Sequence, residues 1–171
     1  MDSDLIIRAC KDVLGRENVN VILTTGHHEL PEDLLPLPDN FHFAAFLPGL
    51  KLAEKCDLLV HHGGYGSCQT GLFTGTPAVI IPTFSERESN ARRIAAAGAG
   101  EYVLPKKSSS KIKEIDLDEF REKLKLVLAD SAYQKKADML SQRLKEFGGP
   151  NTAARLINEF VSKNYKASAL S

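Results

Sequence analysis

The chain has 171 residues, of which 43% are apolar and 26% are charged, which is typical of a globular domain that keeps its charges in solvent. Its 22 basic and 22 acidic residues cancel, so electrostatics gives no reason to expect nucleic acid or an anionic membrane as a partner. No apolar run approaches the roughly 18 residues that a membrane span needs. The acidic start lacks a signal-peptide layout, and Cys10, Cys56 and Cys68 lack metal-ligand spacing, so we expect free thiols and a cytoplasmic location.

Short apolar runs alternate with helical patterns through the first two thirds of the chain. In chain order we expect a helix at 4–14, strands at 19–25 and 41–46, a helix at 50–55, a strand at 57–61, a helix at 67–74, a strand at 77–82, a helix at 86–97 and a strand at 101–104. The strand runs are continuously apolar, which is typical of parallel strands covered on both faces. This order predicts an α/β fold with a Rossmann-like, doubly wound parallel sheet.

The segment after Pro105 changes in character. Residues 106–114 are polar, and we expect an exposed loop whose lysines are solvated. Helical patterns follow at 117–129, 131–147 and 151–163, with Asn151 as the expected N-cap of the last. The sequence therefore predicts one domain, residues 1–171, that ends in helices.

The first expected element is a helix, whereas a doubly wound sheet usually begins with a strand. We therefore expect the chain to be a fragment that lacks a central first strand. Loss of such a strand would leave unpaired sheet edges, which invite self-association.

The sharpest local signal is the run HHGGYGS at 61–67, between an expected strand and an expected helix. Glycines permit a tight turn and close approach of a ligand, and the first N–H groups of a helix attract phosphate. His62 and Ser67 add hydrogen-bond donors. The alternative is a glycine-rich turn without a ligand, because the dinucleotide and phosphate-loop motifs are both missing.

Neighbouring residues of this turn have simpler interpretations. His61 and Cys68 are expected to pack in the interior. Ser67 and His62 do not form a nucleophile pair, because a third orienting group and the G-x-S-x-G elbow are missing. His27 and His28 follow the first expected strand without metal-ligand spacing, and we expect loop histidines near the ligand rather than a metal site.

The wider segment from Phe46 to Asn90 reads FLPGLKLAEKCDLLVHHGGYGSCQTGLFTGTPAVIIPTFSERESN. It resembles the nucleotide-sugar signature of the UDP-glycosyltransferases, above all the bacterial and archaeal members that glycosylate macrolides. The shared elements are an aromatic-x-Pro segment, a strand ending in HHGG, a Gly-Ser pair, G-x-P, a strand ending in Pro, an acidic residue and Asn-Ala. The resemblance implies the C-terminal half of a GT-B fold, which binds the sugar donor.

The resemblance also implies roles for individual positions. Phe46 takes the place of a tryptophan that stacks on the base, and the backbone at Leu47 and Pro48 contacts the base edge. The diphosphate positions are His62, Gly64, Gly66 and Ser67. Glu86 accepts hydrogen bonds from sugar hydroxyls, and Asn90 positions a helix.

Three positions depart from the family pattern. Gly49 replaces a glutamine that contacts the base. Thr70 stands where a glutamate binds ribose, and a threonine makes one weaker bond there. Arg87 replaces a neutral residue; it would pair with a uronic-acid carboxylate or a phosphate, although a surface ion pair with Glu86 or Glu88 is favoured.

Together these features predict a glycosyltransferase donor domain that uses a UDP-sugar or another NDP-sugar, with no cofactor and no metal. The catalytic base is expected in an N-terminal half, which also binds the acceptor, a small molecule or a lipid. This chain alone is therefore expected to contain no catalytic residue and to be inactive. Two alternatives stay open: the donor subunit of a two-chain N-acetylglucosaminyltransferase, and a non-catalytic nucleotide-sugar-binding module, which Thr70 and Gly49 favour.

Overall fold

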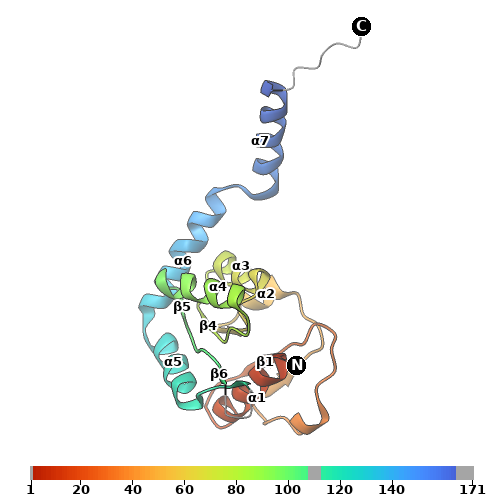
Figure 1. Ribbon diagram of the computed structural model, residues 1–171, viewed down its shortest axis with the longest axis vertical. Coiled ribbons are helices and arrows are strands. Elements are labelled where there is room, and N and C mark those ends of the chain that lie inside the picture. The colour runs from red at the N-terminus through yellow and green to blue at the C-terminus, as the bar shows by residue number, and fades with distance from the viewer. Residues whose placement is uncertain (1, 108–112, 165–171) are drawn as a thin grey trace.

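The computed structural model describes residues 2–107 and 113–164 (Figure 1). The strands and helices alternate as predicted, and three helices follow them. The elements are α1 (Asp2–Leu14), β1 (Val21–Leu23), the 3-10 helix η1 (Glu32–Leu34), β2 (Phe41–Phe43), α2 (Gly49–Ala53), β3 (Leu59–His61), α3 (Tyr65–Thr74), β4 (Ala78–Ile80), α4 (Ser85–Ala96), β5 (Gly100–Tyr102), β6 (Lys106–Lys107), β7 (Lys113–Glu114), α5 (Leu117–Ala129), α6 (Ser131–Glu146) and α7 (Gly149–Asn164).

The central strands are all parallel, which confirms the predicted α/β class. They form two hydrogen-bonded sheets rather than one: β1 pairs with β2, and β4 lies between β3 and β5. In the second sheet Leu59 lies opposite Ala78 and His61 lies opposite Ile80. The ends of β3 and β4 therefore lie side by side.

Strand β4 separates the two halves of the core. Val79 and Ile81 face one side, where α1 and α5 pack, while Ala78 and Ile80 face the other side, where α3, α4 and α6 pack. All four side chains are at most 3% exposed. Apolar residues on both faces of the strand explain why its sequence run is continuous rather than alternating.

Predictions for two segments after Pro105 are wrong. The expected loop at 106–114 contains β6 and β7, which pair antiparallel with Lys106 opposite Glu114; Lys111 lies outside the described residues. Helix α7 begins at Gly149, so Asn151 lies in its first turn instead of capping it. Gly148, with φ 72°, interrupts the helical conformation after α6, and Pro150 suits the first turn of α7.

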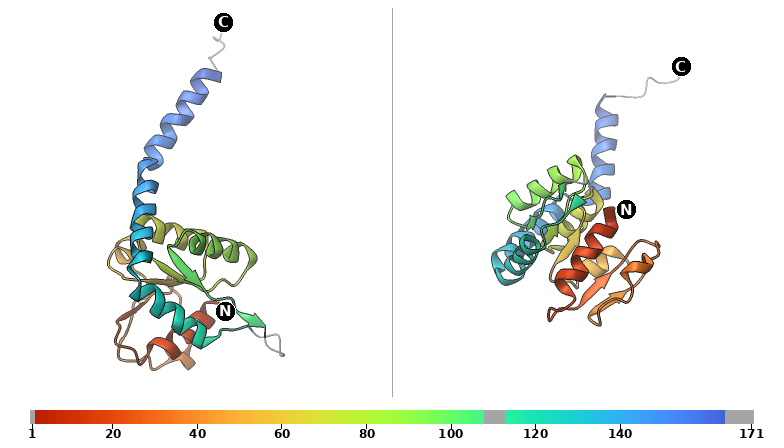
Figure 2. Two further views of the ribbon diagram at one scale, coloured as in Figure 1. Left: turned by 90° about the vertical axis from the view of Figure 1, so that its left-hand side faces the viewer. Right: turned by 60° about the horizontal axis from the view of Figure 1, so that its bottom comes forward.

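The last helix projects from the body of the molecule. Figures 1 and 2 show α7 continuing beyond α6 and away from both sheets. No residue of α7 is buried. Among residues 2–107 and 113–164, no helix is long and apolar enough to cross a membrane.

Candidate functional site

The start of α3 carries the unpaired N–H groups that the glycine turn predicts. The helix begins at Tyr65, two residues earlier than expected, and its N-cap, Gly64, provides no side-chain cap. The first N–H bonded within the helix is that of Cys68, which donates to Gly64 O at 3.0 Å. The N–H groups of Tyr65, Gly66 and Ser67 therefore lack helical partners, and such groups bind anions.

Each glycine of the turn meets a different constraint. Gly63 has φ 81°, and a Cβ there would lie 2.9 Å from both Arg87 O and Ile80 Cγ2. A Cβ on Gly64 would lie 2.4 Å from His62 Nε2, so the His62 ring lies against this glycine. A Cβ on Gly66 would meet no atom within 4 Å. The turn thus requires glycine at position 63 and faces open space at position 66.

Asn90 connects the glycine turn to α4. Its Nδ2 donates to Gly63 O at 3.0 Å and to Glu86 Oε1 at 2.7 Å. One amide therefore holds the turn and orients the exposed Glu86 carboxylate. Spacing predicts the contact with Glu86, which lies one helical turn away, but not the contact with Gly63, which depends on how α4 packs.

His61 supports the turn from beneath, which confirms that it packs in the interior. Its Nδ1 accepts the N–H of Gly63 at 3.0 Å. Burial, aided by the charge of neighbouring His62, lowers the pKa of His61 to about 4, so its imidazole is neutral at ordinary pH. His61 is therefore a positioning residue for the backbone that follows it.

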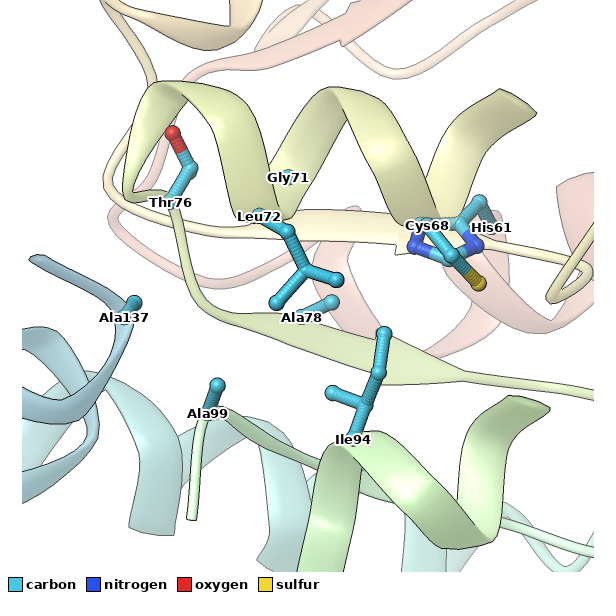
Figure 3. A pocket seen from close by; sticks show the side chains of 9 residues that line it. All are labelled: His61, Cys68, Gly71, Leu72, Thr76, Ala78, Ile94, Ala99 and Ala137. Atoms are coloured by element: carbon cyan, nitrogen blue, oxygen red, sulfur yellow. The ribbon is translucent and has the colours of Figure 1, made fainter. Parts of the chain in front are cut away.

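A small cavity lies beneath α3, lined by His61 and Cys68 at one end and by residues of α3, β4, α4 and α6 elsewhere (Figure 3). Burial, followed by the charge of Glu86, raises the pKa of Cys68 to about 11. The thiol is therefore protonated and unreactive at neutral pH, which confirms Cys68 as a packing residue.

The hydroxyls on α3 differ in availability. Thr70 Oγ1 donates to Gly66 O at 3.0 Å, so this hydroxyl keeps only acceptor capacity toward a ligand. Within the described part of the chain, Ser67 Oγ has no hydrogen-bond partner. Ser67 therefore keeps its donor beside the unpaired N–H groups.

The expected ion pair of Arg87 is wrong. Its Nη1 donates to Thr83 Oγ1 at 2.5 Å, and its guanidinium lies 4.6 Å from the Phe84 ring centroid. In the described ranges it pairs with neither Glu86 nor Glu88. Thr83 lies two residues before α4 and Phe84 is its N-cap, so both contacts hold the Arg87 side chain against the segment that enters the helix.

The side chain of Lys113, in β7, contacts the same segment before α4. Its Nζ donates to Thr83 O at 2.9 Å and lies 5.0 Å from the Phe84 ring centroid. Two cations, those of Lys113 and Arg87, therefore flank Phe84 beside the start of α4. No local pattern predicts this, because Lys113 is 30 residues from Thr83 and lies in a segment that reads as a solvated loop.

The predicted base position lies after β2 and has an aromatic neighbour. The rings of Phe46 and His27 stack with centroids 4.7 Å apart and planes 5° apart. His27 N also donates to Ala45 O at 2.8 Å, and Phe46 stays 58% exposed. One Phe46 face is thus covered, and exposed ring surface remains.

The backbones of the two residues after Phe46 differ in how many of their hydrogen-bonding groups are free for a ligand. Pro48 has no N–H, and its carbonyl accepts from Leu52 N at 3.0 Å at the start of α2. In the described ranges the Leu47 backbone has no such partner. Helix α2 packs against α3, which links this segment to the glycine turn.

Comparisons with known proteins identify the family of this chain. Residues 8–158 match the family model described as erythromycin biosynthesis protein CIII-like, C-terminal domain. The chain is 33% identical over 157 residues to the NDP-glycosyltransferase YjiC of Bacillus subtilis, covering 92% of this chain and 38% of that protein. It is 31% identical over 157 residues to the demethyllactenocin mycarosyltransferase of Streptomyces fradiae, covering 92% and 32%.

Solved structures show the same fold. The calicheamicin glycosyltransferase CalG4 superposes with a TM-score of 0.80 at 23% identity, covering 95% of this chain and 39% of that one. The spinosyn rhamnosyltransferase SpnG complexed with thymidine diphosphate gives 0.70 at 26% identity, covering 84% and 37%. The chain thus spans well under half of each relative. It belongs to the erythromycin biosynthesis protein CIII-like C-terminal domain family and has the fold of the C-terminal half of a GT-B glycosyltransferase.

Proposed function

We propose that this chain binds the nucleotide-sugar donor of a glycosyltransferase. The observation that carries the proposal is the start of α3, where three N–H groups without helical partners, the Ser67 hydroxyl and the His62 side chain surround an open glycine turn. This set favours a diphosphate, because its donors match the charged oxygens.

The remaining positions assign the other parts of the donor. The exposed surface of Phe46 stacks on a pyrimidine base, and the Leu47 backbone contacts the base edge. Thr70 accepts one hydrogen bond from ribose. Glu86, oriented by Asn90, accepts bonds from sugar hydroxyls. A UDP-sugar fits this set, and the thymidine diphosphate bound to SpnG supports a pyrimidine base in general.

The proposed reaction is direct displacement at the anomeric carbon. The acceptor oxygen forms the new glycosidic bond while the bond to the nucleoside diphosphate breaks. A base in the acceptor half removes the acceptor proton, and the acceptor is a small molecule or a lipid. This chain stabilises the negative charge of the departing diphosphate at the start of α3.

The buried reduced thiols of Cys10 and Cys68 support a cytoplasmic location.

Calorimetric titration with UDP, and with TDP and ADP for comparison, tests the proposal. We expect selective binding of pyrimidine diphosphates, and His62→Ala should weaken UDP binding by about 1–3 kcal/mol, the cost of losing a bond to a charged group. His42→Ala is the matched control, because His42 is exposed on β2. Equal binding by both variants, or equal binding of ADP and UDP, would contradict the proposal.

Thr70→Glu tests the ribose assignment separately. A carboxylate accepts from two hydroxyls, so we expect tighter UDP binding by about tenfold. The same substitution should leave affinity for inorganic pyrophosphate unchanged, because that ligand has no ribose. Unchanged UDP affinity would overturn the assignment of Thr70 to ribose.

A further inference from the structure

The loop that follows β1 holds His27 in a backbone conformation that side chains rarely adopt. His27 has φ 75°, and among the described residues it is the only residue other than glycine with a positive φ. Such a conformation persists where surrounding contacts fix it. Two hydrogen bonds do so, because the His27 N–H donates to Ala45 O at 2.8 Å and the Thr25 hydroxyl donates to His28 O. The loop therefore fixes the direction of the His27 side chain.

The His27 ring lies flat against the Phe46 ring. The two centroids are 4.7 Å apart and the planes differ by 5°, which is the offset parallel arrangement that aromatic rings favour. Phe46 nevertheless stays 58% exposed, and His27 is exposed as well. Formation of the apolar core therefore does not account for this contact. The stack covers one face of Phe46 and leaves ring surface in solvent.

The geometry of the turn does not require a histidine at position 27. Asparagine also tolerates a positive φ, and it carries no ring. The imidazole ring is therefore the feature that distinguishes His27 at this position, and its neighbour is Phe46. His28, the next residue, is exposed, and in the described part of the chain it has no ring contact.

The stack orders the Phe46 side chain before any ligand arrives. An exposed phenylalanine side chain can change rotamer, and a ligand that stacks on it must offset the entropy of ordering it. His27 contributes that order in advance, because its own backbone is hydrogen-bonded to Ala45, the residue before Phe46. The two rings thus form one platform whose exposed surface belongs to Phe46.

We propose that His27 is a positioning residue for the nucleotide base. Its ring holds one face of Phe46, and the base stacks on the opposite face, so that three planar rings form one column. His27 does not contact the ligand and acts through Phe46. The identification of the third ring as a nucleotide base rests on the proposed function; the stack of His27 on Phe46 does not.

Calorimetric titration of four variants of the full chain with UDP tests this role. His27→Asn removes the ring and keeps a residue type that tolerates positive φ, so we expect UDP affinity to fall about threefold, within the range of one aromatic pair. His27→Tyr restores a ring and should bind UDP as the original chain does. His28→Asn is the matched control and should bind UDP normally.

The fourth variant separates an action through Phe46 from a general structural effect. In a Phe46→Leu chain there is no ring to position, so adding His27→Asn should cause no further loss of UDP affinity. Affinity for inorganic pyrophosphate should be equal in all these chains, because that ligand has no base. Equal pyrophosphate binding also shows that the glycine turn is folded in each variant.

The outcomes distinguish this role from the proposed function. If the original chain binds UDP and His27→Asn binds it equally well, the role of His27 is overturned and the proposed function stands. Tighter binding by His27→Asn would also overturn the role, because the imidazole would then occupy the face that the base needs. An equal loss in the Phe46→Leu chain would show that His27 does not act through Phe46. Failure of the original chain to bind UDP would overturn the proposed function and this role together.

Discussion

Replacement of Gly63 by alanine should destabilise the protein far more than the same change at Gly66. Alanine at φ 81° costs about 1 kcal/mol in backbone strain. Its Cβ would also lie 2.9 Å from Arg87 O and from Ile80 Cγ2, and neither neighbour is the end of a long flexible side chain. Overpacking of this kind costs about 1–3 kcal/mol, so we expect Gly63→Ala to lower the free energy of unfolding by about 3 kcal/mol.

Gly66→Ala is the matched control. Its Cβ would meet nothing within 4 Å, and Gly66 lies in a helix, where alanine is preferred by up to about 1 kcal/mol. Urea unfolding followed by circular dichroism measures both variants. If the two unfolding free energies differ by less than about 1 kcal/mol, the crowding inferred at Gly63 is wrong.

Three further predictions concern His61 and Asn90, which hold the glycine turn, and Phe46, at the position assigned to the nucleotide base. His61 is neutral in the folded state with a pKa of about 4 against an ordinary 6.5, so the unfolded chain binds a proton between these values. The free energy of unfolding should have its full value above pH 6.5 and fall by about 3 kcal/mol as pH drops toward 4. His61→Asn should remove this dependence, which urea unfolding at a series of pH values measures. Asn90→Ala should lower the free energy of unfolding by about 1–2 kcal/mol and weaken UDP binding in calorimetry, because the turn loses its bond at Gly63 O; normal stability and affinity would show that this bond contributes nothing. Phe46→Trp should strengthen UDP binding about threefold through a larger stacking surface, whereas Phe43→Trp on β2 should not, and equal effects of both would contradict the assignment of Phe46 to the base.

Local patterns were sufficient for the five central strands, the α-helices and the central motif. Continuous apolar runs indicated the buried parallel strands, because burial on both faces leaves no polar position. The run from His61 to Ser67 indicated the turn and the helix start, since glycine conformation and unpaired N–H groups are properties of neighbouring residues. The interior placement of His61 and Cys68 was predicted for the same reason and is confirmed.

Contacts between distant segments required the tertiary structure. The sequence alone did not reveal the stack of His27 on Phe46, the bond from Asn90 to Gly63, or the approach of Lys113 to Thr83. Each joins residues between 19 and 30 positions apart, and its geometry depends on how helices and sheets pack rather than on spacing along the chain.

The division of the sheet shows the same limit. Sequence patterns locate β1 and β3 and indicate that both are parallel strands, because each residue's own burial preference is enough for that. Which strand lies beside which is decided by hydrogen bonds across the sheet, and only the tertiary structure shows that β1 pairs with β2 in one sheet while β4 lies between β3 and β5 in another.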